Sequence, residues 1–176
     1  LTITGPVVAT VSAGAETAPA GGFSVINTGS SINTITIIGA GVTSVITAPT
    51  WAAGGTTDGV LKIIGGDYIT INGFKIQENS SNTVTATGAT NTMTEYGIGL
   101  FLVSSTNGAQ NNTIINCTIT LNSAYPSNVG ILSSSASSST NSALLASAST
   151  GTNSNNKIYS NTISNVGYGI YFVSPV

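Results

Sequence analysis

Ionisable side chains are scarce in this sequence. It has no histidine and no arginine, and charged residues make up 5% of its 176 residues. Histidine is the side chain most often used for proton transfer in catalysis, so its absence argues against an enzyme. The formal net charge of -2 argues against a nucleic-acid partner, which would need a basic surface. We therefore expect no catalytic residue, no cofactor, no bound metal ion and no nucleic-acid partner.

Long apolar runs and cysteine pairs are also missing. No run approaches the roughly 20 apolar residues that span a bilayer, so membrane insertion is not expected. The single cysteine, Cys117, cannot form an internal disulfide. Hydrophobic residues nevertheless make up 40% of the chain, which is not the composition of a disordered protein. The fold must therefore draw its stability from an extended apolar core.

An eight-residue repeat organises the chain. Its copies align without gaps at 35–42, 69–76, 112–119 and 156–163, with apolar residues at the third and eighth positions. The third positions form one predicted rank: Ile37, Ile71, Ile114 and Ile158. The eighth positions form another: Val42, Ile76, Ile119 and Ile163. The sixth positions form a third: Ala40, Phe74, Cys117 and Asn161. Like residues at like positions indicate that the copies stack on one another.

A shorter unit follows each copy of this repeat. Its predicted copies are Asp58-Gly-Val-Leu, Tyr96-Gly-Ile-Gly, Val129-Gly-Ile-Leu and Tyr168-Gly-Ile-Tyr. The segment Gly22–Ile26 resembles a degenerate earlier copy. Tyr96 and Tyr168 hold the same position, which predicts that tyrosine rings stack within the fold.

These patterns predict an all-β fold, a right-handed parallel β-helix (β-solenoid) of roughly four to five coils. Apolar and polar residues alternate over short stretches, as in strands, and Asn, Gly and Ser separate the stretches. A hairpin sheet would need a regular series of Asn-Gly or Asp-Gly turns, which the chain lacks. We expect one domain over 1–176, less regular in 1–57 and clearly repetitive in 58–176. The insertions Gln77–Glu95 and Ser133–Asn155 are predicted to be surface loops.

Three stretches of the chain, 67–74, 111–122 and 156–171, resemble a known family. They read Asp-Tyr-Ile-Thr-Ile-Asn-Gly-Phe, Asn-Asn-Thr-Ile-Ile-Asn-Cys-Thr-Ile-Thr-Leu-Asn and Asn-Lys-Ile-Tyr-Ser-Asn-Thr-Ile-Ser-Asn-Val-Gly-Tyr-Gly-Ile-Tyr. They are similar to the right-handed parallel β-helix repeats of large secreted surface proteins in gliding-type Gram-negative bacteria, many of which are type IX secretion substrates. The resemblance implies a secreted protein, extracellular or at the cell surface. It leaves activity open, because the same repeat serves enzymes, adhesins and scaffolds.

Two pairs of residues are candidates for a functional site. Glu78 and Glu95 bracket the first insertion, and folding can bring them together as a metal or acid/base pair, although solvated loop ends are the alternative interpretation. Trp51 and Tyr125 are candidate glycan contacts, because aromatic rings stack on sugars.

Asparagine and cysteine have structural interpretations. Asn112 and Asn156 share a rank and are predicted to stack amide on amide at a turn. Cys117 shares a rank with Phe74 and is predicted to be a buried small hydrophobe without thiol reactivity.

The sequence favours a structural or adhesive role over catalysis. The chain begins in an expected strand, Leu1–Thr4, and ends just after another, Gly169–Val173, with no capping helix at either end. We therefore expect either an excerpt of a longer β-helix or a subunit that associates with copies of itself, end to end or laterally, into a filament. The alternative is a carbohydrate-binding or polysaccharide-degrading module whose partners are surface glycans.

Overall fold

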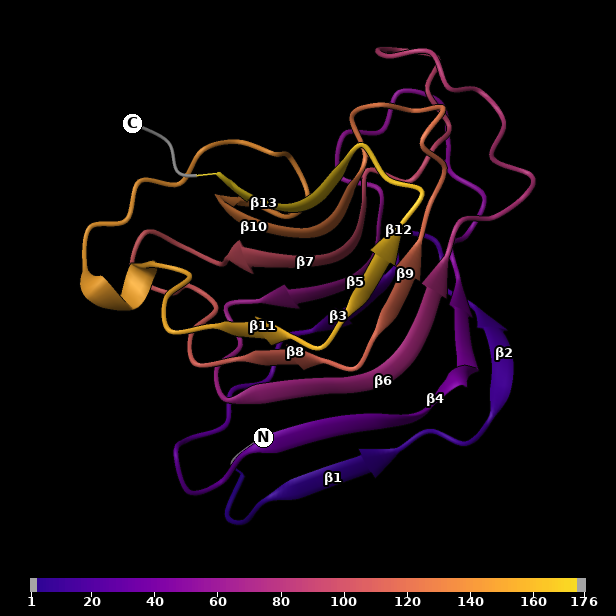
Figure 1. Cartoon of the computed structure of the whole chain (residues 1–176). Helices are drawn as coiled ribbons and strands as arrows, with labels where there is room; N and C mark the ends of the chain where they lie inside the picture. The colour runs from indigo at the N-terminus through magenta and orange to yellow at the C-terminus, as the bar shows by residue number, and fades with distance from the viewer. Residues whose placement is uncertain (1–2, 174–176) are drawn as a thin grey trace.

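The computed structural model describes residues 3–173, whose regular secondary structure is almost entirely parallel β-strand. The strands form two sheets that lie on opposite sides of a shared interior (Figure 1). The first sheet contains β1 (Val7–Thr10), β2 (Gly14–Thr17), β4 (Ile35–Thr47), β6 (Ile69–Gln77), β8 (Thr113–Ile115), β9 (Thr118–Thr120), β11 (Lys157–Tyr159) and β12 (Thr162–Ser164). The second contains β3 (Phe23–Val25), β5 (Gly59–Ile64), β7 (Tyr96–Leu102), β10 (Val129–Ser137) and β13 (Tyr168–Val173).

The only helical element in residues 3–173 is one 3-10 turn, η1 (Ser149–Gly151). No helix in this part of the chain is long and apolar enough to span a membrane.

The chain passes alternately from one sheet to the other. From β3 onward, each return to a sheet adds the next strand beside the previous one, which gives the order β3, β5, β7, β10, β13 in the second sheet. All pairings between these named strands, in both sheets, are parallel. The all-β class with parallel sheets that the sequence predicted is therefore confirmed.

Strand register places the first predicted rank in one line. Ile37 pairs with Ile71, Ile71 with Ile114, and Ile114 with Ile158. The second line runs through Ile76, Ile119 and Ile163, and its β4 member is Ile46.

The prediction that Val42 belongs to this second line is wrong. β4 carries extra residues between Gly41 and Val45, where its register with β6 shifts. Gly41, with φ +70°, takes the left-handed conformation that glycine adopts without strain. The excursion leaves Val42 60% exposed. An earlier register shift, between Ile38 and Gly41, pairs Gly41, rather than the expected Ala40, with Phe74.

The predicted alignment of the shorter unit is wrong by one residue at its first copy. Gly59, not Asp58, pairs with Tyr96, and Leu61 pairs with Ile98. The physical reason is steric, because a Cβ at position 59 would overlap the Tyr96 ring.

Two further expectations for this unit have different outcomes. The degenerate copy at Gly22–Ile26 supplies β3, which pairs with β5. Tyr96 and Tyr168 do not stack on each other, since Val129 lies between them in the register. Tyr96 packs instead against Phe101, at 5.2 Å between ring centroids.

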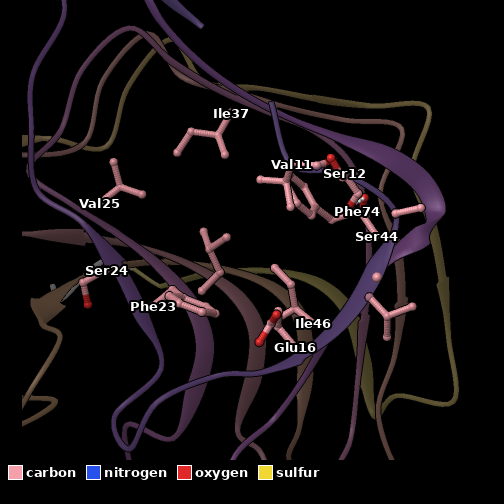
Figure 2. A pocket seen from close by; sticks show the side chains of 14 residues that line it. Val11, Ser12, Glu16, Phe23, Ser24, Val25, Ile37, Ser44, Ile46 and Phe74 are labelled. Carbon is pink, nitrogen blue, oxygen red and sulfur yellow. Dashed lines mark hydrogen bonds between the residues drawn. The ribbon is translucent and has the colours of Figure 1, made fainter. Parts of the chain in front are cut away.

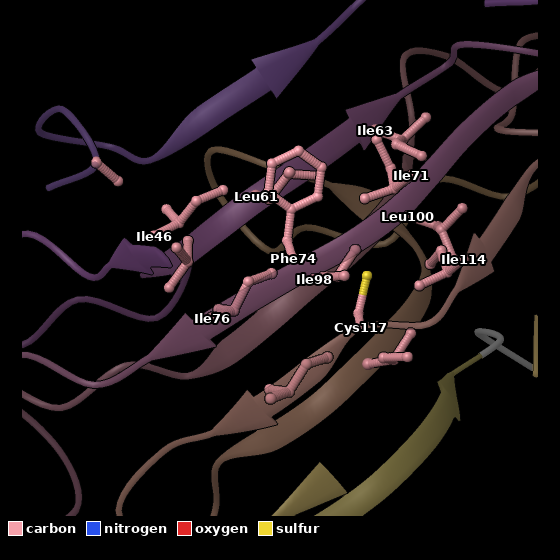
Figure 3. Packing of buried hydrophobic residues seen from close by; sticks show 14 of the residues in the cluster. Ile46, Leu61, Ile63, Ile71, Phe74, Ile76, Ile98, Leu100, Ile114 and Cys117 are labelled. Atoms are coloured by element: carbon pink, nitrogen blue, oxygen red, sulfur yellow. The ribbon is translucent and has the colours of Figure 1, made fainter. Parts of the chain in front are cut away.

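The two sheets bury one continuous apolar core between them. Figure 3 shows Ile71, Ile114, Ile98 and Leu100 directed into this space, with Cys117 beside them. Each fully buried isoleucine or leucine contributes roughly 1.5–3 kcal/mol relative to an exposed one. The in-register lines therefore explain how a chain without an internal disulfide is held together.

Three segments differ from their predicted limits. Ile3 and Thr4 are not in a strand, which begins at Val7, while Leu1 and Thr2 lie outside the described residues. The second insertion starts later than expected, because 133–137 belong to β10. The first insertion starts one residue later than expected, because Gln77 is the last residue of β6, and the loop over 78–95 contains no strand or helix.

Candidate functional site

Three carboxylates meet where the 78–95 loop joins the sheets. Asp58 precedes β5, Glu78 follows β6 and Glu95 precedes β7, so strand ends distant in sequence are neighbours in space. Glu95 Oε2 accepts a hydrogen bond from the Asp58 backbone N–H at 2.9 Å. The structure thus brings the predicted residues Glu78 and Glu95 into one cluster and adds Asp58 to it.

Glu78 closes the base of the loop. Its Oε1 accepts hydrogen bonds from the Asn79 backbone N–H (3.0 Å), from Asn82 Nδ2 (2.8 Å) and from Thr94 Oγ1 (2.7 Å). Its Oε2 accepts one from the Thr94 backbone N–H at 3.1 Å. One carboxylate therefore ties residues from the start and the end of the loop together.

Burial controls the ionisation of the other two carboxyl groups. It raises the pKa of Glu95 to about 8, and the nearby charges of Asp58 and Glu78 act in the same direction. Burial also raises the pKa of Asp58, and the ammonium group of Lys62 opposes this rise. Within residues 3–173, Oδ2 of Asp58 is the one buried side-chain oxygen or nitrogen without a hydrogen-bond partner. The cluster thus favours a bound proton over two adjacent negative charges.

A lysine and a tyrosine complete the cluster. Lys62 Nζ and the Tyr96 hydroxyl both donate to the Thr57 carbonyl, at 2.8 and 2.9 Å. The Lys62 ammonium also lies 5.8 Å from the centroid of the Tyr96 ring. Burial lowers the pKa of Lys62 and raises that of Tyr96. Both groups are therefore bonded to the backbone just before β5.

The cluster does not assemble a ligand set for a metal ion. Among residues 3–173, no three His, Cys, Asp or Glu side chains are arranged to hold one. The oxygens of Glu78 and Glu95 already accept hydrogen bonds from loop residues and from the Asp58 backbone N–H. The hydrogen bonds of this arrangement fix the loop, and the raised pKa values of Asp58 and Glu95 favour their protonated forms.

The two aromatic residues predicted to contact glycans are both buried. Trp51 is 9% exposed, and its Nε1 donates to Thr94 Oγ1 at 2.9 Å. Tyr125 is 6% exposed. Burial, together with the charge of Glu95, raises its pKa. Neither ring offers a free face on which a sugar would stack.

Asn112 and Asn156 bridge strands through their side-chain amides. Asn112 accepts from the Ile69 backbone N–H at 2.9 Å and donates to the Gly66 carbonyl at 2.9 Å. Asn156 accepts from the Asn112 backbone N–H at 2.8 Å and donates to the Ala109 carbonyl at 2.8 Å. The two amides thus repeat one bonding pattern at equivalent positions, and they satisfy main-chain groups where strands turn.

Cys117 is 1% exposed and lies beside Phe74 in the core (Figure 3). Burial raises the pKa of its thiol, which disfavours the reactive thiolate.

An apolar cavity of about 450 Å³ opens at the end of the fold formed by β1 to β4. Figure 2 shows Phe23, Val25, Ile37 and Ile46 around it, with Glu16 beside Ile46. Glu16 pairs with Ile46 in the register of β2 and β4, so both side chains lie on the same side of the sheet, toward the interior. Sequence reasoning missed this placement, although an acidic residue in a near-uncharged strand was a visible signal.

Sequence reasoning also missed how Asn82, Thr94 and Asp58 join the loop cluster. Their polar side chains at strand and loop ends were the available signal, but the pairing depends on the path of the loop. Comparison of the chain with protein-family models, curated proteins and solved structures gave no match.

Proposed function

We propose that this chain is a stretch of a right-handed parallel β-helix with a non-catalytic, structural or adhesive role outside the cell. In this proposal it forms a stiff rod by stacking coils, each coil contributing one strand segment to each sheet. The loops 78–95 and 138–156 are displayed on the side of the rod. The placement outside the cell rests on the resemblance of 67–74, 111–122 and 156–171 to secreted surface repeats.

The observation that carries the proposal is the register of the strands. Ile37, Ile71, Ile114 and Ile158 follow one another across four parallel strands without interruption. Parallel strands of this kind repeat at about 4.8 Å, and each contacts mainly its neighbours. Such an arrangement supplies length and stiffness without requiring a chemical site.

The polar clusters support the same proposal. The amides of Asn112 and Asn156 and the carboxylate of Glu78 are bonded to the protein's own backbone and side chains. Side chains engaged in this way hold turns and loops in place. They do not present free groups to a substrate.

Electron microscopy of cell-surface material labelled with antibodies against this chain tests the proposal. We expect the label along thin, straight rods on intact cells. Label confined to the cell interior, or to compact particles that bind or degrade polysaccharide, would overturn it.

One observation favours carbohydrate binding as a second candidate. A shallow, polar depression of about 490 Å³ lies between the 78–95 loop and the region after β9, and its lining includes Asn79, Asn122 and Asn165. The amides of Asn79 and Asn165 donate to backbone carbonyls, but within the described residues Asn122 uses only its Oδ1, which accepts from the Ala124 N–H, so its Nδ2 is available to a sugar hydroxyl. Titration calorimetry with polysaccharides on wild type and Asn122→Ala separates the two candidates, because only a binding module gives heat that the substitution abolishes.

A further inference from the structure

Two asparagines of this chain precede a glycine, and the fold places them in different surroundings. Asn72 lies within β6, and Asn107 lies in the short turn after β7. An Asn-Gly pair is chemically labile, because glycine has no Cβ to hinder its backbone nitrogen from approaching the asparagine side chain. The structure therefore decides which of the two pairs reacts.

Asn72 is held on both sides by sheet pairing. Its partners in the register are Ile38 of β4 and Ile115 of β8. Its Oδ1 also accepts a hydrogen bond from Asn116 Nδ2 at 3.0 Å. Attack by the Gly73 nitrogen needs the backbone between the two residues to rotate, and this rotation would break the pairing with both neighbouring strands. Reaction at Asn72 thus requires a large part of the sheet to open.

Asn107 lies in a tight turn, and its side chain is exposed to solvent. Its backbone exchanges two hydrogen bonds with Ser104, at 3.2 and 3.3 Å, and its carbonyl also accepts from the Val103 N–H at 2.9 Å. The next residue, Gly108, donates its N–H to the carbonyl of the exposed residue Thr150 at 2.8 Å. Freeing the Gly108 nitrogen therefore disturbs a turn and one bond to a loop, while both sheets stay paired.

We propose that Asn107 is a site of spontaneous deamidation in the folded chain, through a succinimide formed with Gly108. Hydroxide removes the proton of the Gly108 N–H, and this nitrogen attacks Cγ of Asn107. The N–Cγ bond forms, the Cγ–Nδ2 bond breaks, and the amide group leaves as ammonia with a proton taken from water. Water then opens the ring at either carbonyl, which gives aspartate or isoaspartate. The net reaction consumes one water and releases one ammonia.

The product differs from asparagine in charge and in backbone length. A carboxylate replaces a neutral amide in a chain whose formal net charge is already -2. The isoaspartate form also inserts a methylene group into the backbone, so the turn no longer fits its bonds to Ser104 and the bond from Gly108 to Thr150. The modification thus loosens the contact between the turn and the 138–156 loop. This inference goes beyond the proposed rod function and does not depend on it.

The test follows both asparagines in the folded chain at mildly alkaline pH, by peptide mapping with mass spectrometry. We expect deamidation at Asn107 to be at least roughly 10-fold faster than at Asn72, because a turn opens far more often than a sheet. The same chain in urea is the control for intrinsic reactivity. There the register is lost, and the two Asn-Gly pairs should react at similar rates.

The variant Asn107→Ser assigns the product. It removes the reacting amide from the turn, so the mass gain and the isoaspartate should disappear from the peptide that contains position 107, while the slow reaction at Asn72 continues. Equal rates at the two asparagines in the folded chain would show that both react through unfolding of the whole chain, which would overturn the inference. An Asn107 that stays intact in the folded chain, yet reacts in urea, would overturn it as well.

Discussion

Glu95→Gln tests the cluster at the base of the long loop through the pH dependence of stability. Burial and neighbouring charge raise the pKa of Glu95 from 4.5 to about 8 in the folded chain. The folded state therefore holds a proton between these two values that the unfolded state releases. Stability from this group is fully present below pH 4.5 and is lost as the pH rises through about 8.

The size of the effect follows from the width of that window. At 1.36 kcal/mol per pKa unit the shift corresponds to an upper bound of about 4–5 kcal/mol. Partial access of solvent to the group reduces this to about 2–3 kcal/mol. The raised pKa of Asp58 adds a further loss of stability as the pH rises. The lowered pKa of Lys62 has the opposite effect and increases stability at more alkaline pH.

The assay is urea denaturation of wild type and Glu95→Gln from pH 5 to pH 9. Glutamine resembles the protonated acid, so the variant should lose most of the slope and exceed wild-type stability by about 2 kcal/mol near pH 9. Near pH 5 the variant should be about 1 kcal/mol less stable than wild type, because one hydrogen-bond acceptor is lost. Ser80→Ala, at an exposed residue of the same loop, serves as the control and should keep the wild-type slope. A flat wild-type profile, or an unchanged slope in Glu95→Gln, would refute the reasoning.

Three further substitutions test separate contacts by denaturation. Asn112→Ala should lower the unfolding free energy by about 2–3 kcal/mol, because two buried backbone groups lose their hydrogen-bond partner. Asn116→Gly removes an exposed amide and should change the unfolding free energy by less than about 1 kcal/mol. Gly59→Ala should lower the unfolding free energy by about 3 kcal/mol, because the added Cβ overlaps the Tyr96 ring. In the control Gly169→Ala the added Cβ meets no atom within 4 Å, so the unfolding free energy should hardly change. Equal losses in the two variants would contradict the register. Trp51→Phe should cost about 1 kcal/mol through loss of the indole hydrogen bond, and the wild-type tryptophan emission should be that of a buried ring, unchanged by added sugars.

Sequence alone was sufficient where the repeat is uninterrupted. Ile71, Ile114 and Ile158 occupy equal positions in gapless copies, and the strands pair them in that order. Apolar residues at equal positions must all face the same interior, so the pattern carries the register with it.

Sequence alone failed where a single copy departs from the repeat. The excursion between Gly41 and Val45 moves Val42 to the surface, and a gapless alignment has no means to represent it. The shared Gly-Val or Gly-Ile pattern aligned Asp58 with Tyr96, but a Cβ opposite Tyr96 would overlap its ring. Gly59 therefore takes that position. The burial of Trp51 depends on Thr94, on the other side of a loop whose path no local pattern encodes.

Diffraction from oriented material containing this chain is the most direct test of the coiled, rod-like arrangement. Coiled rods should give a strong reflection at about 4.8 Å along the rod axis, because the strands lie across the axis and stack at that spacing. A 4.8 Å reflection perpendicular to the long axis, or its absence from well-oriented rods, would contradict the stacking of coils on which the proposed function depends.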